Sequence, residues 1–273
     1  MRFVLQLVTV VAVAYGGSLA VVAVQDNPWL ALLGGLLTAV LASLAYAWVV
    51  RRTEKREVTE LARAKAAGGL TRGTLIGFAM FAAVIVNIAF LGGFHVDGIG
   101  SVTGSLGLLG VMAAAATTEE LMFRGLLFRW LEKLTGTWIA LVATGLLFGA
   151  MHLLNPDATL WGATAIAVEA GFMLAACYAA TRSLWVTIGL HFGWNFALGG
   201  LFSATVSGNG DSKGLLDTTL TGRDLITGGA FGPEGSVYAV GAGVILTVVF
   251  LWLAARRGTI VAPRRRAAAK VSA

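Results

Sequence analysis

Four stretches of the sequence that are otherwise apolar contain side chains that can ionise or form strong hydrogen bonds. These residues are Glu119 and Glu120, His152, Glu169, and His191 with Asn195. An ionised side chain near the centre of a bilayer costs about 2.5 to 3.5 kcal/mol even on the scale derived from helix insertion. Two adjacent glutamates therefore need partners or a water-filled cavity, and we expect them to mark a functional site inside a membrane.

The spacing of these residues indicates which of them share a helix face. Glu120 and Arg124 are four positions apart, as are His191 and Asn195, and side chains with this spacing lie one above the other on a helix. Glu119 points about 100° away from Glu120. The spacing predicts that one of the two glutamates pairs with Arg124 and that the other is free.

The positions of the polar residues along their helices predict a common depth. Glu119 lies 17 residues before Gly136, and His152 lies 16 residues after it. In an antiparallel hairpin that turns at Gly136, both side chains would stand roughly 24 Å from the tip. His191 and Asn195 follow the expected start of their helix by 7 and 11 residues, which places them roughly 10 to 17 Å deep. We expect all four side chains to share one cavity that is open to the cytoplasm.

Carboxylate, imidazole and amide groups in a cavity of low dielectric constant are the components of a hydrolytic site. A buried glutamate can take a proton from water and pass it on. A histidine can orient that water or bind a metal ion, and Asn195 with a histidine can donate hydrogen bonds to a developing oxyanion. A single intramembrane histidine is more often a packing residue, but the combination favours catalysis. Glu169 stays outside this set, since it can equally line the cavity or bond to a neighbouring helix, and His95 is expected to be solvated.

Hydrophobic runs long enough to cross a membrane must position these residues. A bilayer core of about 30 Å takes roughly 20 apolar residues of helix, and by this measure the chain has about eight crossings. They are expected at residues 3–24, 29–50, 74–94, from 101 through the glutamate pair, 138–154, 160–180, 184–206 and 236–255. The sequence thus predicts an all-α, polytopic helical membrane protein with about eight transmembrane helices and a cytoplasm-facing intramembrane cavity.

The composition also indicates a membrane protein. Of the 273 residues, 57% are hydrophobic and only 12% are charged, against about 25% charged residues in a typical soluble domain. The formal net charge of +6 does not indicate nucleic-acid binding, because the basic residues stand in short runs beside apolar segments. The single cysteine, Cys177, excludes an intramolecular disulfide and is expected to be a small buried residue. The 36 glycines are spread through the apolar runs, where small residues let helices approach closely.

We expect one membrane domain, because no linker rich in proline, serine or glycine divides the chain. Its parts are residues 1–100, with three crossings and the loop 51–73; residues 101–206, the catalytic core; and residues 207–273, with an outer loop, the last crossing and a basic tail. The loop 51–73 has mixed charge at helical spacing, which favours a solvated cytoplasmic helix. The polar segment 207–235 is expected to be a connection, with a lid as the alternative. No cleavage site closes the first run, so we expect a retained helix rather than a signal peptide.

The distribution of lysine and arginine predicts the orientation. With both termini in the cytoplasm, 18 of the 20 lysines and arginines fall in cytoplasmic segments, and only Lys213 and Arg223 fall outside. Cytoplasmic segments of membrane proteins are enriched in these residues. We therefore expect a multi-pass protein of the cell membrane, surrounded by the lipid bilayer, with both termini cytoplasmic. The composition is rich in alanine and glycine and favours arginine over lysine, which is typical of a bacterium of high GC content.

Three segments resemble the motifs of a known family. Residues 119–125 read EELMFRG, residues 148–152 read FGAMH, and residues 183–195 read SLWVTIGLHFGWN. They are similar to the Glu-Glu-x-x-x-Arg, Phe-x-x-x-His and His-x-x-x-Asn motifs of the CAAX-protease and bacteriocin-processing (CPBP, Abi) family of intramembrane proteases. The type II CAAX prenyl endopeptidases belong to this family. The motifs stand in the family order without departure, and the resemblance covers roughly residues 101–206.

The resemblance implies a role for each polar residue. Glu119 and His152 would activate a water molecule for attack on a peptide bond. His191 and Asn195 would stabilise the oxyanion that forms. Glu120, together with the arginine of its motif, would support the site.

The resemblance also raises the question of a metal ion, because members of the family are often called metalloproteases. Glu119, His152 and His191 would then be the ligands of a zinc ion. The sequence has no His-Glu-x-x-His segment, and this ligand set is unusual for zinc. A metal-free mechanism based on glutamate is an equal alternative.

The resemblance leaves the substrate open. The eukaryotic branch removes the last three residues of prenylated proteins, whereas bacterial relatives are linked to bacteriocin maturation or self-immunity. We expect an unidentified membrane-associated protein or peptide. Two other functions use the same buried groups. One is a proton-coupled transporter, which predicts inverted repeats that we do not find, and the other is a non-catalytic scaffold or immunity protein that binds a partner helix.

Overall fold

The computed structural model describes residues 1–263, and nearly all regular structure in this part of the chain is helical. Apolar runs fold as helices in a membrane because a helix satisfies its own backbone hydrogen bonds. Seven segments of the described residues are long and apolar enough to cross a membrane. They are Arg2–Ala23, Pro28–Glu54, Arg63–Phe90, Val102–Thr135, Thr137–Leu154, Leu160–Thr181 and Val237–Arg256. The predicted all-α polytopic class is confirmed, and the basic tail from Arg264 onward lies outside the described residues.

The first part of the chain forms three long helices and a short connection. They are α1 (Arg2–Ala23), α2 (Pro28–Glu54) and α3 (Ala66–Phe90), with the 3-10 turns η1 (Thr59–Leu61) and η2 (Arg63–Lys65) before α3. Asn27 caps α2, because its side chain accepts hydrogen bonds from two backbone amides of the first turn. Lys55 ends α2 in the left-handed backbone conformation, with φ at 54°. The predicted helix over residues 51–73 is therefore wrong, since α2 ends at Glu54 and two short turns precede α3; most charged side chains here are exposed, while Glu54, Arg56 and Glu60 form ion pairs.

The polar residues of interest lie on the helices of residues 102–201. These elements are α4 (Val102–Glu120), the π-helical η3 (Leu121–Phe128), α5 (Arg129–Thr135), α6 (Thr137–Met151), the 3-10 turn η4 (His152–Leu154), α7 (Leu160–Ile166), the π-helical η5 (Ala167–Phe172), α8 (Met173–Thr181), α9 (Leu184–Asn195) and the π-helical η6 (Phe196–Leu201). α4, η3 and α5 follow one another without a break, and Gly136, with φ at 85°, turns the chain into α6. The turn predicted at Gly136 is confirmed.

The predicted crossing at residues 184–206 differs from the others. It is helical over α9 and η6, but it is not among the seven segments that are apolar enough to span a membrane. His191 and Asn195 lower its hydropathy, and most of its residues are buried by neighbouring helices. The expectation of about eight crossings therefore counts one helix more than length and composition support in residues 1–263.

The last part of the described chain contains a strand that pairs with a distant segment. Its elements are β2 (Leu216–Leu220), α10 (Asp224–Thr227), the 3-10 turns η7 (Gly229–Phe231) and η8 (Pro233–Gly235), and α11 (Val237–Arg256). β2 pairs antiparallel with β1 (Phe94–Ile99), from Phe94 opposite Leu220 to Ile99 opposite Leu216. This small sheet joins the segment of residues 202–235 to the end of α3, and no pattern in the sequence predicts it.

Glycines fix the position of α9 by letting it touch α3 through the backbone. A Cβ on Gly73 would lie 2.2 Å from the backbone oxygen of Val186, and a Cβ on Gly77 would lie 2.0 Å from that of Leu190. Since no side chain fits at these positions, α3 and α9 approach more closely than larger residues would allow. The two helices run in the same direction. Their contact uses the glycine face of α9 and so fixes the position of the opposite face, which carries His191.

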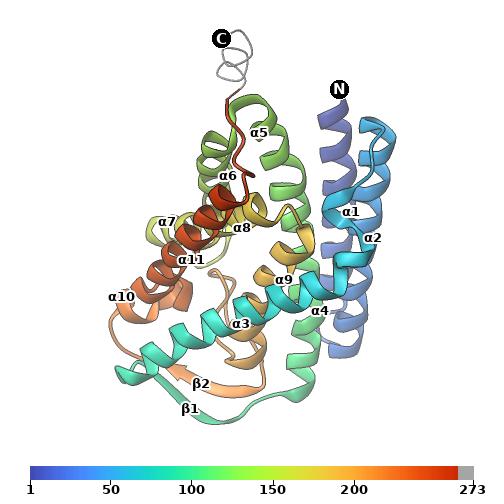
Figure 1. Cartoon of the computed structure of the whole chain (residues 1–273). Coiled ribbons are helices and arrows are strands. Elements are labelled where there is room, and N and C mark those ends of the chain that lie inside the picture. Colours follow the sequence, from blue (N-terminus) through green and yellow to red (C-terminus); the bar gives the residue numbers. More distant parts are fainter. Residues whose placement is uncertain (264–273) are drawn as a thin grey trace.

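The two ends of the molecule differ, as Figure 1 shows. The start of α1 and the last described residues lie at one end, which we call the terminal end. β1 and β2 lie at the opposite end, which we call the strand end. The chain runs from the strand end to the terminal end in α4, η3 and α5, and it returns in α6.

Candidate active site

A cavity of about 690 Å³ lies between α4, α6, α9 and the segment that follows η6. Glu119 at the end of α4, His152 in η4, and His191 with Asn195 on α9 all line this cavity. The prediction that these four side chains share one cavity is confirmed. Its volume is within the range of about 300 to 1,000 Å³ that is usual for ligand sites.

Glu120 lies behind the cavity and links two other polar residues. Its side chain is fully buried, and its Oε1 accepts a hydrogen bond of 2.7 Å from Nη1 of Arg124. The same oxygen is 3.0 Å from Nδ1 of His191. Because an ionised carboxylate only accepts, Nδ1 of His191 carries the proton and donates it in this bond. The prediction that one glutamate pairs with Arg124 is confirmed, and Nε2 is the ring nitrogen of His191 that is left for the cavity.

Arg124 connects η3 to η5. Its Nη2 donates hydrogen bonds of 3.2 and 3.1 Å to the backbone carbonyls of Ala170 and Gly171. Both partners belong to a π-helical segment, where the interrupted helical ladder leaves carbonyl groups for other donors. The guanidinium also lies over the ring of Phe148, 4.7 Å from its centroid. The arginine of the first motif is thus a buried cross-link between helices.

Glu119 is the free carboxylate of the pair. About 30% of its side chain is exposed, and its Oε2 has no hydrogen-bond partner among the described residues. Nε2 of His191 is 3.9 Å from this oxygen, which is too far for a direct hydrogen bond. The geometry leaves the Glu119 carboxylate available to a molecule inside the cavity.

His152 has one ring nitrogen fixed by the backbone. Its Nδ1 is 2.8 Å from the carbonyl oxygen of Phe148, and since a carbonyl only accepts, Nδ1 carries the proton. Nε2 of a neutral His152 therefore holds the lone pair. The ring of Phe148 also packs against His152, at 4.8 Å between centroids, and against His191, at 6.0 Å. Phe148, the phenylalanine of the second motif, thus packs against both histidines of the cavity.

Glu234 is a site carboxylate that the sequence analysis missed. It is buried in η8 and lines the cavity. Its Oε1 accepts a hydrogen bond of 2.9 Å from Nε1 of Trp194, and its Oε2 accepts from the backbone amide and from Oγ of Ser207, the latter at 3.0 Å. Burial raises the pKa of Glu234, although the hydrogen bonds from Ser207 oppose this shift. In the sequence, Glu234 is a single acidic residue just before the last apolar run. No motif or spacing in the sequence indicates its contact with α9.

The segment after η6 forms a wall of the cavity. Residues 206–212, except for Gly208, are among those that line it, and Asn155 reaches this segment through a hydrogen bond of 2.6 Å to the carbonyl of Ser207. Glu234 holds the same segment against α9, as described above. The polar stretch 207–235 is therefore more than a connection between helices.

Two other polar residues lie outside the cavity. Glu169 is fully buried in η5, and neither of its carboxylate oxygens has a hydrogen-bond partner in residues 1–263. α11 packs closely against it, since a Cβ on Gly243 would lie 2.3 Å from the Cα of Glu169. His95 is exposed in β1, as expected, and Cys177 is buried, as expected.

The arrangement of donors does not fit the expected metal site. Over the described part of the chain, no group of three or more histidine, cysteine, aspartate or glutamate residues is placed to hold a metal ion. Glu119 and His191 face each other, but His152 does not join them in such a group. The Nδ1–H of each histidine is held within the protein, as is usual for a metal-binding histidine, so the misfit lies in the placement of His152 and not in the histidine tautomers. We therefore assign no step of the reaction to a zinc ion.

Comparison with known proteins identifies the family of the central part of the chain. Residues 101–197 match the family model described as type II CAAX prenyl endopeptidase Rce1-like. The match begins at the N-cap of α4 and ends just after Asn195, so it contains all three motifs. Searches of curated proteins and of solved structures found no match. The resemblance to the CPBP family that the motifs indicate is confirmed for this segment.

Proposed function

We propose that this chain, which carries an Rce1-like domain at residues 101–197, is an endopeptidase that hydrolyses a peptide bond of a membrane-associated protein or peptide. The family match supports a membrane protease of the CAAX type in general. The observation that carries the finer proposal is the meeting of Glu119, His152, His191 and Asn195 in one cavity between apolar helices. Such a cavity provides a base, an orienting imidazole and hydrogen-bond donors in a site of low dielectric constant.

Glu119 is the proposed general base. Its carboxylate is partly exposed to the cavity, and Oε2 has no partner within residues 1–263. One proton of a water molecule moves to this carboxylate while the water oxygen bonds to the carbonyl carbon of the substrate. His152 orients the water, because its Nε2 accepts a hydrogen bond from the second hydrogen while Nδ1 is held by the backbone.

Asn195 and His191 are the proposed donors to the oxyanion. The Asn195 side chain lines the cavity near His191, one helical turn away on α9. Nδ1 of His191 already donates to Glu120, so Nε2 donates only when the ring is protonated. The carboxylates of Glu119 and Glu120 compensate the charge of that imidazolium. Arg124 in turn neutralises Glu120 and fixes its position, so it is a positioning residue.

The reaction is complete when the tetrahedral intermediate breaks down. The carbon–nitrogen bond breaks, and the proton held by Glu119 passes to the leaving nitrogen, which restores the carboxylate. The products are a new carboxyl terminus and a new amino terminus. No other reactant than water is needed.

A peptidase assay on purified protein in detergent tests the proposal. The substrate is a pool of fluorescence-quenched peptides with apolar residues around the central bond. Loss of a general acid or base slows a reaction by about 10²- to 10⁴-fold, and loss of one oxyanion donor by about 10²- to 10³-fold, so we expect such losses for His152→Gln and Asn195→Ala. His95→Gln and Asn87→Ala change exposed residues of the same types and should leave the rate unaltered. Cleavage that persists in both site variants would contradict the proposed site, and no cleavage by the unaltered protein would favour a non-catalytic or transport function.

A further inference from the structure

The cavity reaches from the catalytic residues to the surface toward the strand end, and on the terminal side it ends at residues such as Met122 and Met173. Toward the strand end, beyond Glu119 and His152, its walls come from turns and helix ends. They include Gln25, Leu108, Leu154, Asn155 and residues 209–212. No residue of 1–24, 44–65 or 253–263 lines this cavity. Several of the wall residues are themselves exposed, among them Gln25, Leu154 and Asp211, so the cavity reaches the surface on this side.

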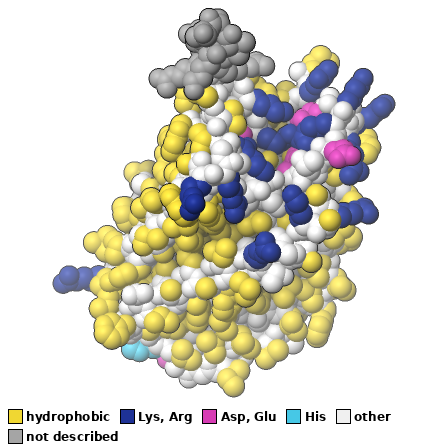
Figure 2. Space-filling view, in the orientation of Figure 1, with side chains coloured by type: hydrophobic (Ala, Val, Ile, Leu, Met, Phe, Trp, Pro, Cys, Tyr) yellow, Lys and Arg dark blue, Asp and Glu magenta, His cyan; other side chains and the backbone are white. Residues whose placement is uncertain are grey.

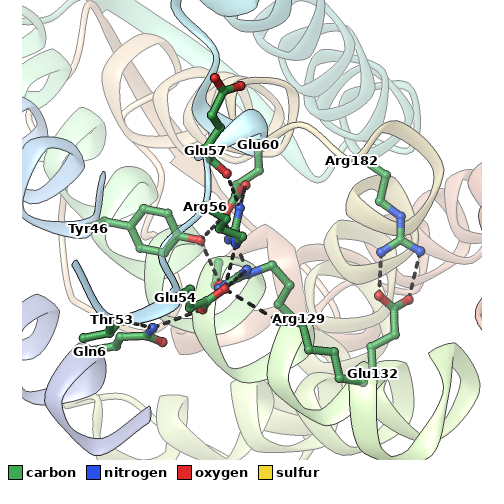
Figure 3. A network of polar contacts seen from close by, with 12 residues as sticks. Gln6, Tyr46, Thr53, Glu54, Arg56, Glu57, Glu60, Arg129, Glu132 and Arg182 are labelled. Carbon is green, nitrogen blue, oxygen red and sulfur yellow. Dashed lines mark hydrogen bonds and ion pairs between the residues drawn. The ribbon is translucent and has the colours of Figure 1, made fainter. Parts of the chain in front are cut away.

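A network of ion pairs closes the terminal end of the molecule (Figure 3). Glu54, at the end of α2, binds Arg129 of α5 at 2.6 Å and Arg56 at 2.6 Å. Arg56 also binds Glu60 at 2.6 Å, and the hydroxyl of Tyr46 donates a 2.7 Å hydrogen bond to Glu60. These contacts join α2, η1 and α5 into one layer. A molecule that entered from the terminal end would have to separate these charged groups.

A second ion pair lies beside this network, also on α5. Glu132 of α5 binds Arg182, after α8, at 2.5 Å, which ties the α5–α6 turn to the start of α9 (Figure 3). Below it, the fully buried Arg124 and the ring of Phe128 fill the interior. The catalytic residues are therefore separated from the terminal end by packed side chains and ion pairs.

Positive charge is concentrated at the closed end. In the face that Figure 2 shows, lysine and arginine gather toward the terminal end, whereas the surface near the strand end is mainly apolar. Among the lysines and arginines of residues 1–263, Lys213 and Arg223 belong to the segment around β2 at the strand end. Since lysine and arginine mark the cytoplasmic side of a membrane protein, the terminal end is the cytoplasmic one.

We infer that the active-site cavity opens on the extracytoplasmic side and that its substrates are extracytoplasmic segments of exported or membrane-inserted polypeptides. The substrate class rests on the proposed peptidase function, whereas the direction of the opening is independent of that function. The sequence predicts both a cytoplasm-facing cavity and cytoplasmic termini. These two predictions are not compatible with each other in this structure. The cavity opening lies at the opposite end of the molecule from the start of α1 and the last described residues.

The charges of the cavity favour an internal stretch of polypeptide as the substrate. Among the described residues that line it, none is lysine or arginine, whereas Glu119, Asp211 and Glu234 bring carboxylates. The free carboxylate at the end of a polypeptide would find no lysine or arginine here and would face the carboxylates. The remaining walls are largely apolar, with side chains such as Met122 and Phe148. The cavity thus fits an uncharged, apolar segment better than the last residues of a cytoplasmic protein.

Cysteine labelling in intact cells tests the direction of the opening. The background is the full chain with Cys177→Ala, since Cys177 is the sole cysteine and is buried. Asp211→Cys reports on the cavity rim, Asp26→Cys on another turn of the strand end, and Lys133→Cys on the terminal end; all three positions are exposed. A membrane-impermeant maleimide should label the first two in intact spheroplasts as fully as after lysis, and Lys133→Cys only after lysis. The reverse pattern would overturn the inference.

Vesicles of defined orientation test the substrate class with the same quenched peptide pool. We expect right-side-out vesicles to cleave the pool without permeabilisation and inside-out vesicles to cleave it only after detergent is added. Cleavage by intact inside-out vesicles alone would overturn the inference and leave the peptidase function in place. If the protein in detergent cleaves nothing, the proposed function and the substrate class both fail, while the labelling still decides the direction of the opening.

Discussion

Replacement of Arg124 by methionine tests whether the buried ion pair holds the active site together. The guanidinium is 1% exposed, donates at 2.7 Å to Glu120, and bonds the carbonyls of Ala170 and Gly171. Removal of one partner from a buried ion pair typically costs about 3 to 5 kcal/mol, because the other charge is left uncompensated. The two carbonyls lose their donor as well, so we expect Arg124→Met to lower the free energy of unfolding by about 4 kcal/mol or more.

The measurement is unfolding by sodium dodecyl sulfate in mixed micelles, for Arg124→Met, Glu120→Gln and the double variant. A neutral amide at position 120 needs no counter-ion. The double variant should therefore lose about 1 to 3 kcal/mol less unfolding free energy than the two single losses added together. Lys133→Met is the control. Lys133 is 60% exposed, and its ion pair with Glu54, at 3.6 Å, is worth less than about 1 kcal/mol because it lies at the surface. Additive single effects, or a loss for Arg124→Met no larger than for Lys133→Met, would refute the reasoning.

Three further predictions concern packing, pH and the cavity wall. Gly77→Leu should lower the yield and thermal stability of the folded protein, because even a Cβ there would lie 2.0 Å from a backbone oxygen of α9; Gly68→Leu on the same helix meets open space and should not. Burial alone would raise the pKa of Glu60, but the hydrogen bonds from Arg56 and Tyr46 and the charge of Arg129 together lower the pKa below the usual 4.5. The stability from this carboxylate is thus present above pH 4.5 and is lost as the pH falls through the lowered pKa, so Arg56→Gln should move the midpoint of acid unfolding to higher pH. Glu234→Ala leaves buried donors of Trp194 and Ser207 without an acceptor, at about 1 to 3 kcal/mol each, and should make the segment 202–215 a site of faster limited proteolysis.

The helices follow from the sequence because each apolar run carries its own signal. The run predicted at residues 3–24 is α1 at Arg2–Ala23, and the run at 236–255 is α11 at Val237–Arg256. α3 begins at Ala66, eight residues before the predicted start at Thr74. The alanines and glycines of this first part follow the charged residues 51–65, and the composition of the whole stretch is therefore that of a polar loop.

The central part of the site also follows from the sequence, because its geometry is local. Glu120 and Arg124 are one helical turn apart, and this spacing is enough to predict their ion pair. The meeting of Glu119 and His152 in one cavity needs only the turn at Gly136 and two antiparallel helical arms, and the π-helical η3 does not prevent it.

The remaining features depend on contacts between segments that are far apart in the chain. Glu234 meets Trp194 across 40 residues, and β1 pairs with β2 across more than 100. Neither contact leaves a periodic signal in the sequence. The direction in which the cavity opens is set by the same long-range contacts, because the segment after η6 folds over one side of the site and the ion pairs of Glu54 close the other.

The most direct test of the central claim compares the same chemical change in two glutamates of the helical core. Glu119→Gln removes the proposed base, whereas Glu169→Gln alters a carboxylate that is fully buried and lies outside the cavity. The measurement is the initial rate of peptide cleavage by each purified variant. We expect Glu119→Gln to lose about 10²-fold or more and Glu169→Gln to match the unaltered protein. Equal rates for the two variants would contradict the claim that Glu119 activates the attacking water.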